Sequence, residues 1–328
     1  MMPAGRFDSQ DGLDRDLATL ARAYGVGEMT PATFDDLRAA RTGYFATPRD
    51  YYTSTEAQFT GLHSPEGSVH FGLAWDGRFH PDGFLEQARM VESLVRRTGA
   101  RDVLEIGSGK GLNGIHLARR NPDVSFAGVD ITPLHVRIAS ERGAGLTNLT
   151  FVECDFHRLT PWKDASLDVV FDVEAGCYAD TPEKLRASFA ELRRVLRPGG
   201  LFVTFGWCRT NGFGGLDRRT RLAAELVERA WVVRQFPLEC TWEQTAAEVG
   251  FAPVERRDLR AASMPSVVRL YRQARMFYAS LASPARPLVR MLMRRSTHNA
   301  VSALMLPYTY GLGALEYRMA VLAVPGAS

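Results

Sequence analysis

The chain has 328 residues, of which 45% are hydrophobic and 23% charged, a composition ordinary for a globular protein with one large domain, with or without a cap. A formal net charge of +3 is too small to indicate nucleic-acid binding. The four cysteines are scattered without a C-x-x-C pair, so they predict reduced thiols rather than a zinc site or a disulfide framework. No stretch approaches the roughly 20 apolar residues of a membrane span. Residues 1–16 lack the apolar core of a signal peptide, so we expect a cytoplasmic protein.

The first 80 residues precede any clear strand. Helical periodicity runs through residues 10–45 and is interrupted at 25–31, where glycine and proline occur. Residues 50–80 are rich in aromatic side chains without such periodicity, and we expect an irregular segment there. A helix over 82–98 then leads into the first strand.

Beyond this helix, apolar strands alternate with amphipathic helices. The expected strands are 102–106, 124–130, 149–154, 167–175 and 201–207, with intervening helices at 133–142 and 183–196. Such alternation predicts βαβ units and a parallel sheet. The strands are apolar almost throughout, which indicates that both faces of the sheet are buried.

The last third of the chain predicts a further cap. Helices are expected near 216–232 and 242–249, a sixth strand at 251–259, an insertion of two or three helices at 264–313, and a final strand in LEYRMAVLAVP. The expected parts are an N-terminal cap segment at 1–80, a core at 81–263, a helical cap insertion at 264–313 and the last core strand within 314–328.

A glycine-rich turn follows the first expected strand. Residues 103–111 read VLEIGSGKG, and residues 112–120 have helical character. Glycine lets a ligand approach the backbone where a Cβ would clash, and the N–H groups at a helix start are exposed. The acid Asp130 closes the next apolar run, SFAGVD. Together these features predict a nucleoside-type cofactor over the first two strands of an α/β sheet.

The spacing of the glycines admits two cofactors. Gly109, Gly111 and Gly114 satisfy G-x-G-x-x-G, the dinucleotide fingerprint, and Asp130 lies at a suitable distance for a ribose contact. In a dinucleotide site, however, the first glycine ends the strand directly. Here Gly107 does so, and Leu112 falls where the third glycine belongs.

The pattern Glu105-x-Gly107-x-Gly109-x-Gly111 instead resembles motif I of class I methyltransferases, which bind S-adenosylmethionine. The resemblance covers about residues 85–207, including the turn LRPGG at 196–200. It implies a doubly wound, mostly parallel, seven-stranded Rossmann-like sheet, with the final strand antiparallel between the fifth and sixth, and an α-helical cap. The implied cofactor-binding residues are Glu105, Gly107, Gly109, Gly111, Asp130, Ile131, Asp155 and Phe156. Of these, Asp130 would hold the ribose hydroxyls, and Asp155 and Phe156 would flank the adenine.

Chemistry is expected at the carboxyl ends of the strands, where open α/β sheets bind ligands. The fourth strand ends in DVEAGCY and the fifth in FGW, which brings Glu174 together with Tyr178 and Trp207. Glu174 is either a general base in an aromatic pocket or a structural residue that caps a helix or pairs with an arginine.

Two looser segments resemble the sterol C-methyltransferases and the related prenyl-diphosphate C-methyltransferases. One is VEAGCYADTPEK, and the other is the aromatic stretch from Tyr51 to Phe79. Sterol enzymes typically carry Thr-Cys-His where this chain has Gly-Cys-Tyr, so a shorter isoprenoid fits equally well. The resemblance implies methylation of an alkene through a carbocation, with Glu174 as base. The aromatic side chains proposed to face the cation are Trp207, Tyr178, Tyr52 and Phe71, although each alone is more often a packing residue than a catalytic one.

Two sets of basic residues admit more than one interpretation. His70 is either a ligand to substrate phosphate or Mg²⁺, or a structural histidine. Arg286, Arg290 and Arg294 recur at i, i+4 and i+8 and form a diphosphate clamp, a membrane contact or a solvated face. Magnesium is expected only if the substrate is a diphosphate, and no dedicated metal site is predicted.

Two other functions stay open from the sequence. An O- or N-methyltransferase of an aromatic natural product would use Glu174 to orient the substrate. A non-catalytic scaffold with this fold need not keep the glycines and Asp130, so their presence argues against it. The expected partners are a small-molecule substrate, for which we predict an isoprenoid, and further copies of the chain in a homo-oligomer.

Overall fold

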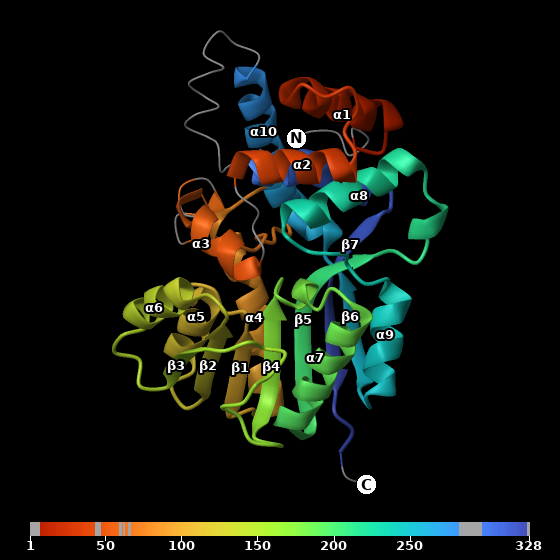
Figure 1. Cartoon of the computed structure of the whole chain (residues 1–328). Helices are drawn as coiled ribbons and strands as arrows, with labels where there is room; N and C mark the ends of the chain where they lie inside the picture. The colour runs from red at the N-terminus through yellow and green to blue at the C-terminus, as the bar shows by residue number, and fades with distance from the viewer. Residues whose placement is uncertain are drawn as a thin grey trace.

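The computed structural model describes residues 7–42, 47–58, 61, 63–64, 67–281 and 297–326. Its centre is a seven-stranded sheet with the order β3-β2-β1-β4-β5-β7-β6 (Figure 1). The strands are β1 (Asp102–Ile106), β2 (Ser125–Asp130), β3 (Leu149–Glu153), β4 (Leu167–Val173), β5 (Leu196–Arg209), β6 (Ala252–Asp258) and β7 (Leu315–Ala323). The first five are parallel, and β7 runs antiparallel between β5 and β6, which confirms the predicted fold class.

Helices cover both faces of the sheet because successive residues of each strand point to opposite sides. Val103 belongs to a hydrophobic cluster that includes residues of α4 (Glu86–Thr98) and α5 (Leu112–Arg120), whereas its neighbour Leu104 belongs to a second cluster with residues of α7 (Pro182–Val195) and α9 (Glu239–Glu248). Helix α6 (Pro133–Arg142) packs against β2 and β3. The strand order reverses at β1, which pairs with β2 on one side and β4 on the other. Ligands in such sheets bind above this switch point.

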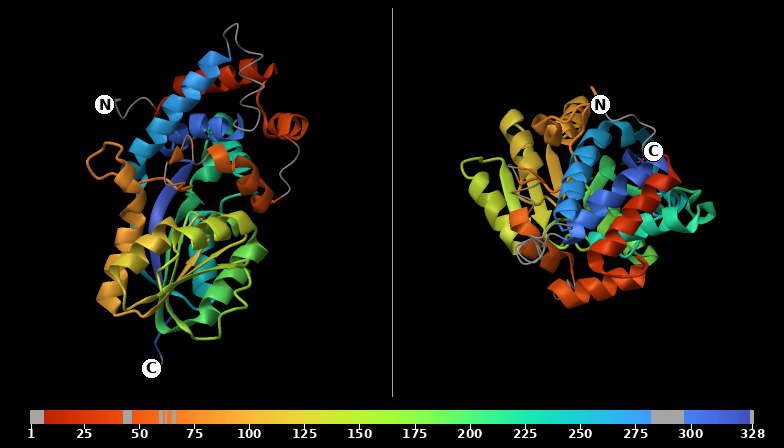
Figure 2. Two further views of the ribbon diagram at one scale, coloured as in Figure 1. Left: turned by 90° about the vertical axis from the view of Figure 1, so that its left-hand side faces the viewer. Right: turned by 90° about the horizontal axis from the view of Figure 1, so that it is seen from above.

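A helical cap stands over the carboxyl edge of the sheet (Figures 1 and 2). It consists of α1 (Gln10–Tyr24), α2 (Pro31–Thr42), α3 (Pro48–Gln58), α8 (Arg218–Ala230), α10 (Arg260–Ser280) and α12 (Thr297–Gly311). Short 3₁₀ helices occur at Pro81–Leu85, Gly176–Tyr178 and Phe213–Gly215. Among the described residues, no helix is both long enough and apolar enough to cross a bilayer.

Asp16 joins three of the cap helices. Its carboxylate is fully buried and accepts hydrogen bonds from the hydroxyls of Tyr271 on α10, at 2.8 Å, and Tyr308 on α12, at 2.9 Å. The Arg275 guanidinium lies 2.7 Å from its other oxygen. A buried carboxylate is stable only with such partners, so this cluster fixes α1 against the two C-terminal cap helices.

The structure differs from the predicted elements in two main places. Residues 48–58 form α3, although we expected an irregular segment over 50–80. Thr47 accepts a hydrogen bond from the Asp50 amide and Pro48 occupies the first turn, both features of a helix start that the aromatic residues obscured. Helix α10 begins at Arg260, four residues before the predicted insertion, and continues through Pro265.

Candidate active site

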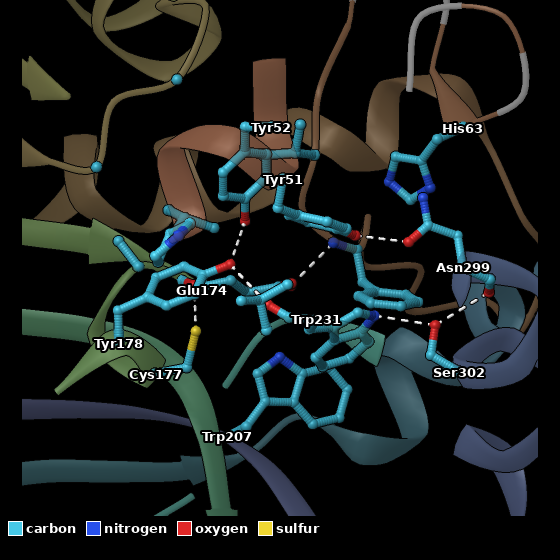
Figure 3. Close-up of a pocket in the computed structure, with 18 of the residues that line it drawn as sticks. Tyr51, Tyr52, His63, Glu174, Cys177, Tyr178, Trp207, Trp231, Asn299 and Ser302 are labelled. Carbon is cyan, nitrogen blue, oxygen red and sulfur yellow. Dashed lines mark hydrogen bonds between the residues drawn. The ribbon is translucent and has the colours of Figure 1, made fainter. Parts of the chain in front are cut away.

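A cavity of about 750 Å³ lies between the carboxyl edge of the sheet and the cap (Figure 3). Its floor comes from the ends of β1 to β5, and its roof comes from α3, α10 and α12 with the end of α8. Residues predicted from the sequence that line it are Gly107, Gly109, Asp130, Ile131, Asp155, Phe156, Glu174, Tyr178, Trp207, Tyr52 and Phe71. Segments far apart in sequence therefore share one cavity.

The glycines after β1 serve different purposes. All three have left-handed backbone, with φ of +65° at Gly107, +52° at Gly109 and +77° at Gly111. A Cβ on Gly107 would lie 2.2 Å from the Ala175 Cβ, and one on Gly111 would lie 2.6 Å from the Phe151 ring. A Cβ on Gly109 would meet no atom within 4 Å. Gly109 thus opens directly onto the cavity, whereas Gly111 starts α5 outside it.

Asp130 shapes this floor from the end of β2. One carboxylate oxygen accepts the Gly109 N–H at 2.9 Å, and the other accepts the Thr132 N–H at 2.8 Å. Burial alone would raise the pKa of Asp130, but its interactions with His135 and these amides bring the pKa below its usual value. An ionised carboxylate at this position has lone pairs for ribose hydroxyls.

Glu105 does not reach the cavity, which differs from its predicted place in the cofactor site. Its side chain lies beneath the glycine turn, where Oε1 accepts a hydrogen bond from the Asn113 amide at 2.8 Å. Burial raises the pKa of Glu105 to about 8. In this position the carboxyl group supports the start of α5 from below.

Glu174 projects from the end of β4 with strained backbone, at φ +64°. Its amide donates to the Phe205 carbonyl at 2.7 Å, and its Oε1 accepts the Phe71 N–H at 2.9 Å. Burial raises the pKa of Glu174 to about 7, against the lowering effect of the Phe71 amide and the Tyr317 hydroxyl. A left-handed non-glycine residue costs about 1–3 kcal/mol and occurs most often at functional sites.

Asp172 supports this turn from below. The side chain is fully buried, and its Oδ1 accepts the amides of Ala175 and Gly176 at 3.1 and 2.9 Å. Burial raises the pKa of Asp172 to about 6. Its two hydrogen bonds hold the chain in the turn that directs Glu174 to the cavity.

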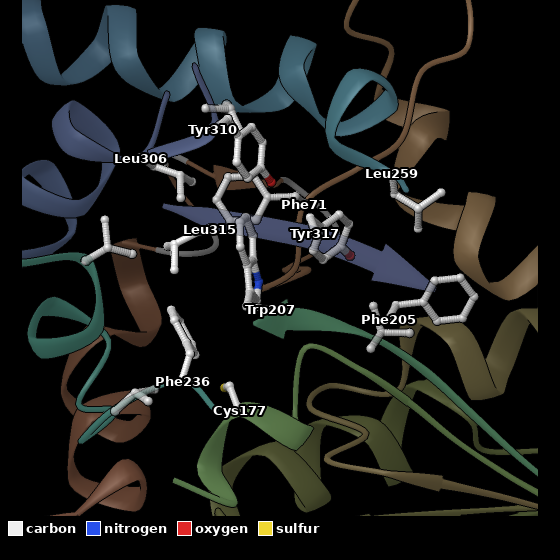
Figure 4. Close-up of a cluster of buried hydrophobic side chains, with 14 of the residues drawn as sticks. Phe71, Cys177, Phe205, Trp207, Phe236, Leu259, Leu306, Tyr310, Leu315 and Tyr317 are labelled. Carbon is white, nitrogen blue, oxygen red and sulfur yellow. The ribbon is translucent and has the colours of Figure 1, made fainter. Parts of the chain in front are cut away.

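Aromatic rings form the wall around Glu174. The Trp207 ring centroid lies 5.5 Å from that of Phe71 and 5.3 Å from that of Trp231. Figure 4 shows Trp207 surrounded by Phe71, Tyr310, Tyr317 and Phe236, and only 4% of its surface is exposed. On the opposite side, the Tyr178 and Tyr52 hydroxyls are 3.0 Å apart.

The sequence did not predict several residues that the cap contributes to this wall. The Trp231 indole N–H donates to Ser302 at 3.0 Å, and the Tyr51 hydroxyl donates to Asn299 at 2.5 Å (Figure 3). Val232 follows Trp231 with φ +59°, a costly conformation for a β-branched residue. A left-handed conformation at Val232 has no signal in a single sequence.

His70 does not face the cavity, so the structure gives no support to its predicted role as a substrate ligand. Its Nε2 bonds to the Phe84 carbonyl at 2.8 Å, and its Nδ1 bonds to Ser68 at 3.0 Å. Burial lowers the pKa of His70 to about 4, as expected for a neutral structural histidine. His63 lines the cavity instead. Arg286, Arg290 and Arg294 lie outside the described residues.

The comparisons with known proteins agree with this geometry. Residues 103–200 match the family model described as "Methyltransferase domain". A 24-methylenesterol C-methyltransferase of Arabidopsis thaliana is 28% identical over 194 residues, which is 58% of this chain and 53% of the relative. The chain thus spans about half the length of that relative.

Two solved structures have a similar fold at low sequence identity. Geranyl diphosphate C-methyltransferase from Streptomyces coelicolor A3(2), in complex with Mg²⁺, geranyl diphosphate and S-adenosyl-L-homocysteine, matches with a TM-score of 0.57 and 15% identity over 85% of this chain and 99% of that one. A cyclopropane synthase from Mycobacterium tuberculosis matches with a TM-score of 0.65 and 11% identity, over 85% and 100% of the two chains. The fold is that of the class I methyltransferases that use S-adenosylmethionine. Over the matched residues the sequence resembles a sterol C-methyltransferase, and the fold resembles that of a geranyl diphosphate C-methyltransferase.

The residues present on the cavity floor fit this cofactor. Space is open above Gly109, the Asp130 carboxylate accepts the Gly109 N–H beside it with a lowered pKa, and Phe156 lines the same cavity. Among the described residues, no cluster of three or more His, Cys, Asp or Glu side chains is arranged to hold a metal ion. Magnesium therefore stays a prediction tied to a diphosphate substrate.

Gly109→Val should abolish binding of S-adenosylhomocysteine, because the added side chain would occupy the cofactor space and the residue has φ +52°. Gly99→Val is the matched control. Gly99 ends α4 with φ +69°, and a Cβ there also meets nothing within 4 Å, but the residue is remote from the cavity. Calorimetry should therefore show normal binding for the Gly99 variant. Equal binding of S-adenosylhomocysteine by both variants would contradict the assignment of Gly109 to the cofactor site.

Proposed function

We propose that the protein transfers a methyl group from S-adenosylmethionine to an alkene carbon of an isoprenoid, with Glu174 as the base that completes the reaction. The observation that carries this proposal is the position of Glu174. Its carboxylate stands at the end of β4, in an aromatic cavity that is continuous with the glycine turn and Asp130. A methyl donor and a base thus have one enclosed space in common.

The floor residues would hold and orient the cofactor. Gly107 and Gly109 admit it close to the backbone, Asp130 accepts its ribose hydroxyls, and Phe156 contacts its base. When bound there, S-adenosylmethionine supplies an electrophilic methyl group. The cap then closes the substrate side of the cavity, which keeps water away from the reacting carbon.

The aromatic wall would stabilise the charge that methyl transfer creates. The substrate π-bond forms a C–C bond to the methyl carbon, the bond from that carbon to sulfur breaks, and positive charge remains on the neighbouring substrate carbon. An aromatic face within about 6 Å stabilises a cation by about 0.5–2 kcal/mol. Trp207, Trp231 and Tyr178 line the cavity near Glu174 and present such rings.

Glu174 would then remove a proton from a carbon next to the cation and regenerate an alkene. Its pKa of about 7 suits a base at neutral pH, because a useful fraction is ionised while the proton affinity stays high. The Phe71 amide holds Oε1, which fixes the carboxylate while the other oxygen reacts. The products are methylated alkene, S-adenosylhomocysteine and the protonated carboxyl group.

The comparisons support carbon as the methyl acceptor. The Arabidopsis relative is named a C-methyltransferase of a sterol, and the Streptomyces structure a C-methyltransferase of geranyl diphosphate. The described cavity wall includes the carboxylates Asp130, Asp155, Glu174 and Asp180. Lys184 also lines the cavity and pairs with Asp180 at 2.7 Å, so the carboxylate beside the aromatic wall is Glu174, where it would favour a cationic intermediate.

Trp207→Phe and Trp207→Leu test the cationic intermediate. The Phe variant keeps a π-face and should keep much of the turnover, whereas the Leu variant should lose about ten- to thirtyfold in kcat. Phe236→Leu is the packing control, because Phe236 stacks on Trp207 at 6.4 Å but does not line the cavity. It should lower stability without lowering kcat at saturation.

Equal kcat for the folded, cofactor-saturated Phe and Leu variants would remove the argument for charge on carbon at Trp207. Transfer to oxygen or nitrogen would then be the better account. A Leu variant that lost kcat only as much as the Phe236 control would lead to the same conclusion.

A further inference from the structure

A group of four ionisable side chains joins the cap to the cofactor floor. The Glu56 carboxylate on α3 lies 2.7 Å from the Lys110 Nζ and 3.4 Å from the His135 Nε2. On its other side, the His135 Nδ1 lies 3.6 Å from an oxygen of Asp130. The side chains of Lys110 and His135 are 4% and 2% exposed, so these contacts are shielded from water.

Each member of the group belongs to a different part of the site. Lys110 follows Gly109 in the glycine turn, His135 is in the first turns of α6, and Asp130 binds the Gly109 amide. Glu56 is one helical turn beyond Tyr52, which lines the substrate cavity. The group therefore extends from the ribose-binding acid to the aromatic wall.

The N-terminal segment also encloses Lys110 from a second direction. Gly67 has φ +72°, and a Cβ there would lie 2.4 Å from the Lys110 Nζ. The Lys110 carbonyl in turn lies 3.4 Å from the Arg142 guanidinium of α6. The ammonium group is thus set between Glu56 and the Gly67 backbone.

The charges of the four groups balance. Burial alone would lower the pKa of His135, but Asp130 and Glu56 raise it above its usual value, which favours the imidazolium form. Lys110 and His135 then supply two positive charges, opposite the two carboxylates. Replacing Glu56 with a neutral residue would leave a buried ammonium beside an amide, and breaking such a pair from one side is costly.

We propose that Glu56 is a positioning residue that fixes α3 to the cofactor floor through Lys110 and His135, so that the cofactor site and the Tyr51–Tyr52 wall of the substrate cavity form together. This proposal rests on the proposed cofactor site. Because coupling between two sites is reciprocal, cofactor binding should hold α3 more firmly, and loosening α3 should weaken cofactor binding.

The experiment measures both directions of this coupling in the full chain. Calorimetry gives the affinity for S-adenosylhomocysteine, and hydrogen exchange gives the protection of the backbone amides of residues 48–58 with and without that ligand. The variants are Glu56→Gln, Lys110→Met and the double variant. Arg49→Gln is the matched control, since Arg49 is on the same helix and pairs with Glu153 at 2.8 Å, but both side chains are almost half exposed.

Glu56→Gln should weaken binding about tenfold or more and speed exchange over 48–58 to a similar extent. Adding Lys110→Met should restore part of both, because it removes the buried ammonium that Gln leaves uncompensated. Arg49→Gln should stay within about twofold of the unaltered protein, as exposed ion pairs contribute little.

Three results would overturn the coupling. They are unchanged affinity and exchange in Glu56→Gln, no restoration by Lys110→Met, and an equal effect of Arg49→Gln. The exchange rates of the unliganded variants test the attachment of α3 even if a variant binds poorly. Failure of the unaltered protein to bind S-adenosylhomocysteine is a separate outcome, which would overturn the cofactor assignment and with it the coupling.

Discussion

Glu174→Gln is expected to lower turnover by about 10²-fold or more while the affinity for S-adenosylhomocysteine stays unchanged. A loss of this size is typical when a general base is removed. The affinity should be retained because Glu174 stands beside the aromatic wall, which we assign to the substrate rather than to the cofactor. The Gln side chain can still accept the Phe71 N–H, so the local structure should persist. Near-normal turnover in this variant would contradict the role of Glu174 as a base and would leave it a structural role.

The pH dependence provides a second reading of the same variant. A base acts when ionised, so the turnover of the unaltered protein should rise with pH through about 7 and level off above it. The residual turnover of Glu174→Gln should lack this rise. A rise of equal size in the variant would assign the titration to another group.

The free energy of unfolding should fall as the pH rises, which is opposite to the change in turnover. Burial raises the pKa of Glu174 from 4.5 to about 7, so the folded protein binds the proton more tightly than the unfolded chain does. The ionised side chain therefore destabilises the fold increasingly between these values, by about 3 kcal/mol above pH 7. Denaturant unfolding should show Glu174→Gln gaining stability over the unaltered protein from pH 5 to pH 8. A constant difference across this range would contradict the assignment.

Asp16→Ala is expected to lower the free energy of unfolding by about 3–5 kcal/mol, because it leaves the Arg275 guanidinium and two tyrosine hydroxyls without their buried acceptor. Asp14→Ala is the control on the same helix. Asp14 pairs with Arg219 near the surface, and its loss should cost no more than about 1 kcal/mol.

The same variant should also disturb the site. Asp16 fixes α1 to α10 and α12, and the latter two helices form the roof of the cavity. Turnover should therefore fall with the stability of Asp16→Ala, whereas Asp14→Ala should keep it. Equal unfolding free energies for the two variants would show that Asp16 does not hold the cap.

The sequence was most informative where the site depends on local geometry. The glycine turn, the acid at the end of β2 and the strand alternation are short-range patterns, and they predicted a parallel sheet and most residues of the floor. Glu174 and Trp207 could be placed because the ends of parallel strands meet at one edge. Their roles stay predictions.

The sequence predicted a cap and Tyr52, but the other residues of the roof could not be predicted because their positions depend on contacts between distant segments. Tyr51 bonds to Asn299 and Trp231 bonds to Ser302, and no sequence period relates such pairs. The contact of Glu56 with Lys110 is likewise invisible until α3 is placed over the glycine turn. His70 and His63 illustrate the same limit, since both are buried histidines and only the fold decides which one lines the cavity.

Two residues with strained backbone line different parts of the cavity wall. Glu174 and Val232 both have positive φ and both line the cavity, one at the end of β4 and the other after α8. Strain of this kind persists only where surrounding contacts fix it. At Glu174 those contacts are the Phe205 carbonyl and the Phe71 amide, which belong to the sheet and the N-terminal segment.

The most direct test of carbon methylation uses S-adenosylmethionine whose methyl group carries three deuterium atoms. The protein is incubated with this donor and an isoprenoid-rich lipid extract, and the products are analysed by mass spectrometry. We predict a new product that keeps all three deuterium atoms on a methyl group bonded to carbon, and that is absent with Glu174→Gln. Two retained deuterium atoms would show that the proton is lost from the transferred methyl carbon itself, to give an exomethylene group or a cyclopropane, and a cyclopropane synthase is one of the structural neighbours. A trideuteromethyl ether or amine would contradict the account, because the methyl group would then have gone to oxygen or nitrogen.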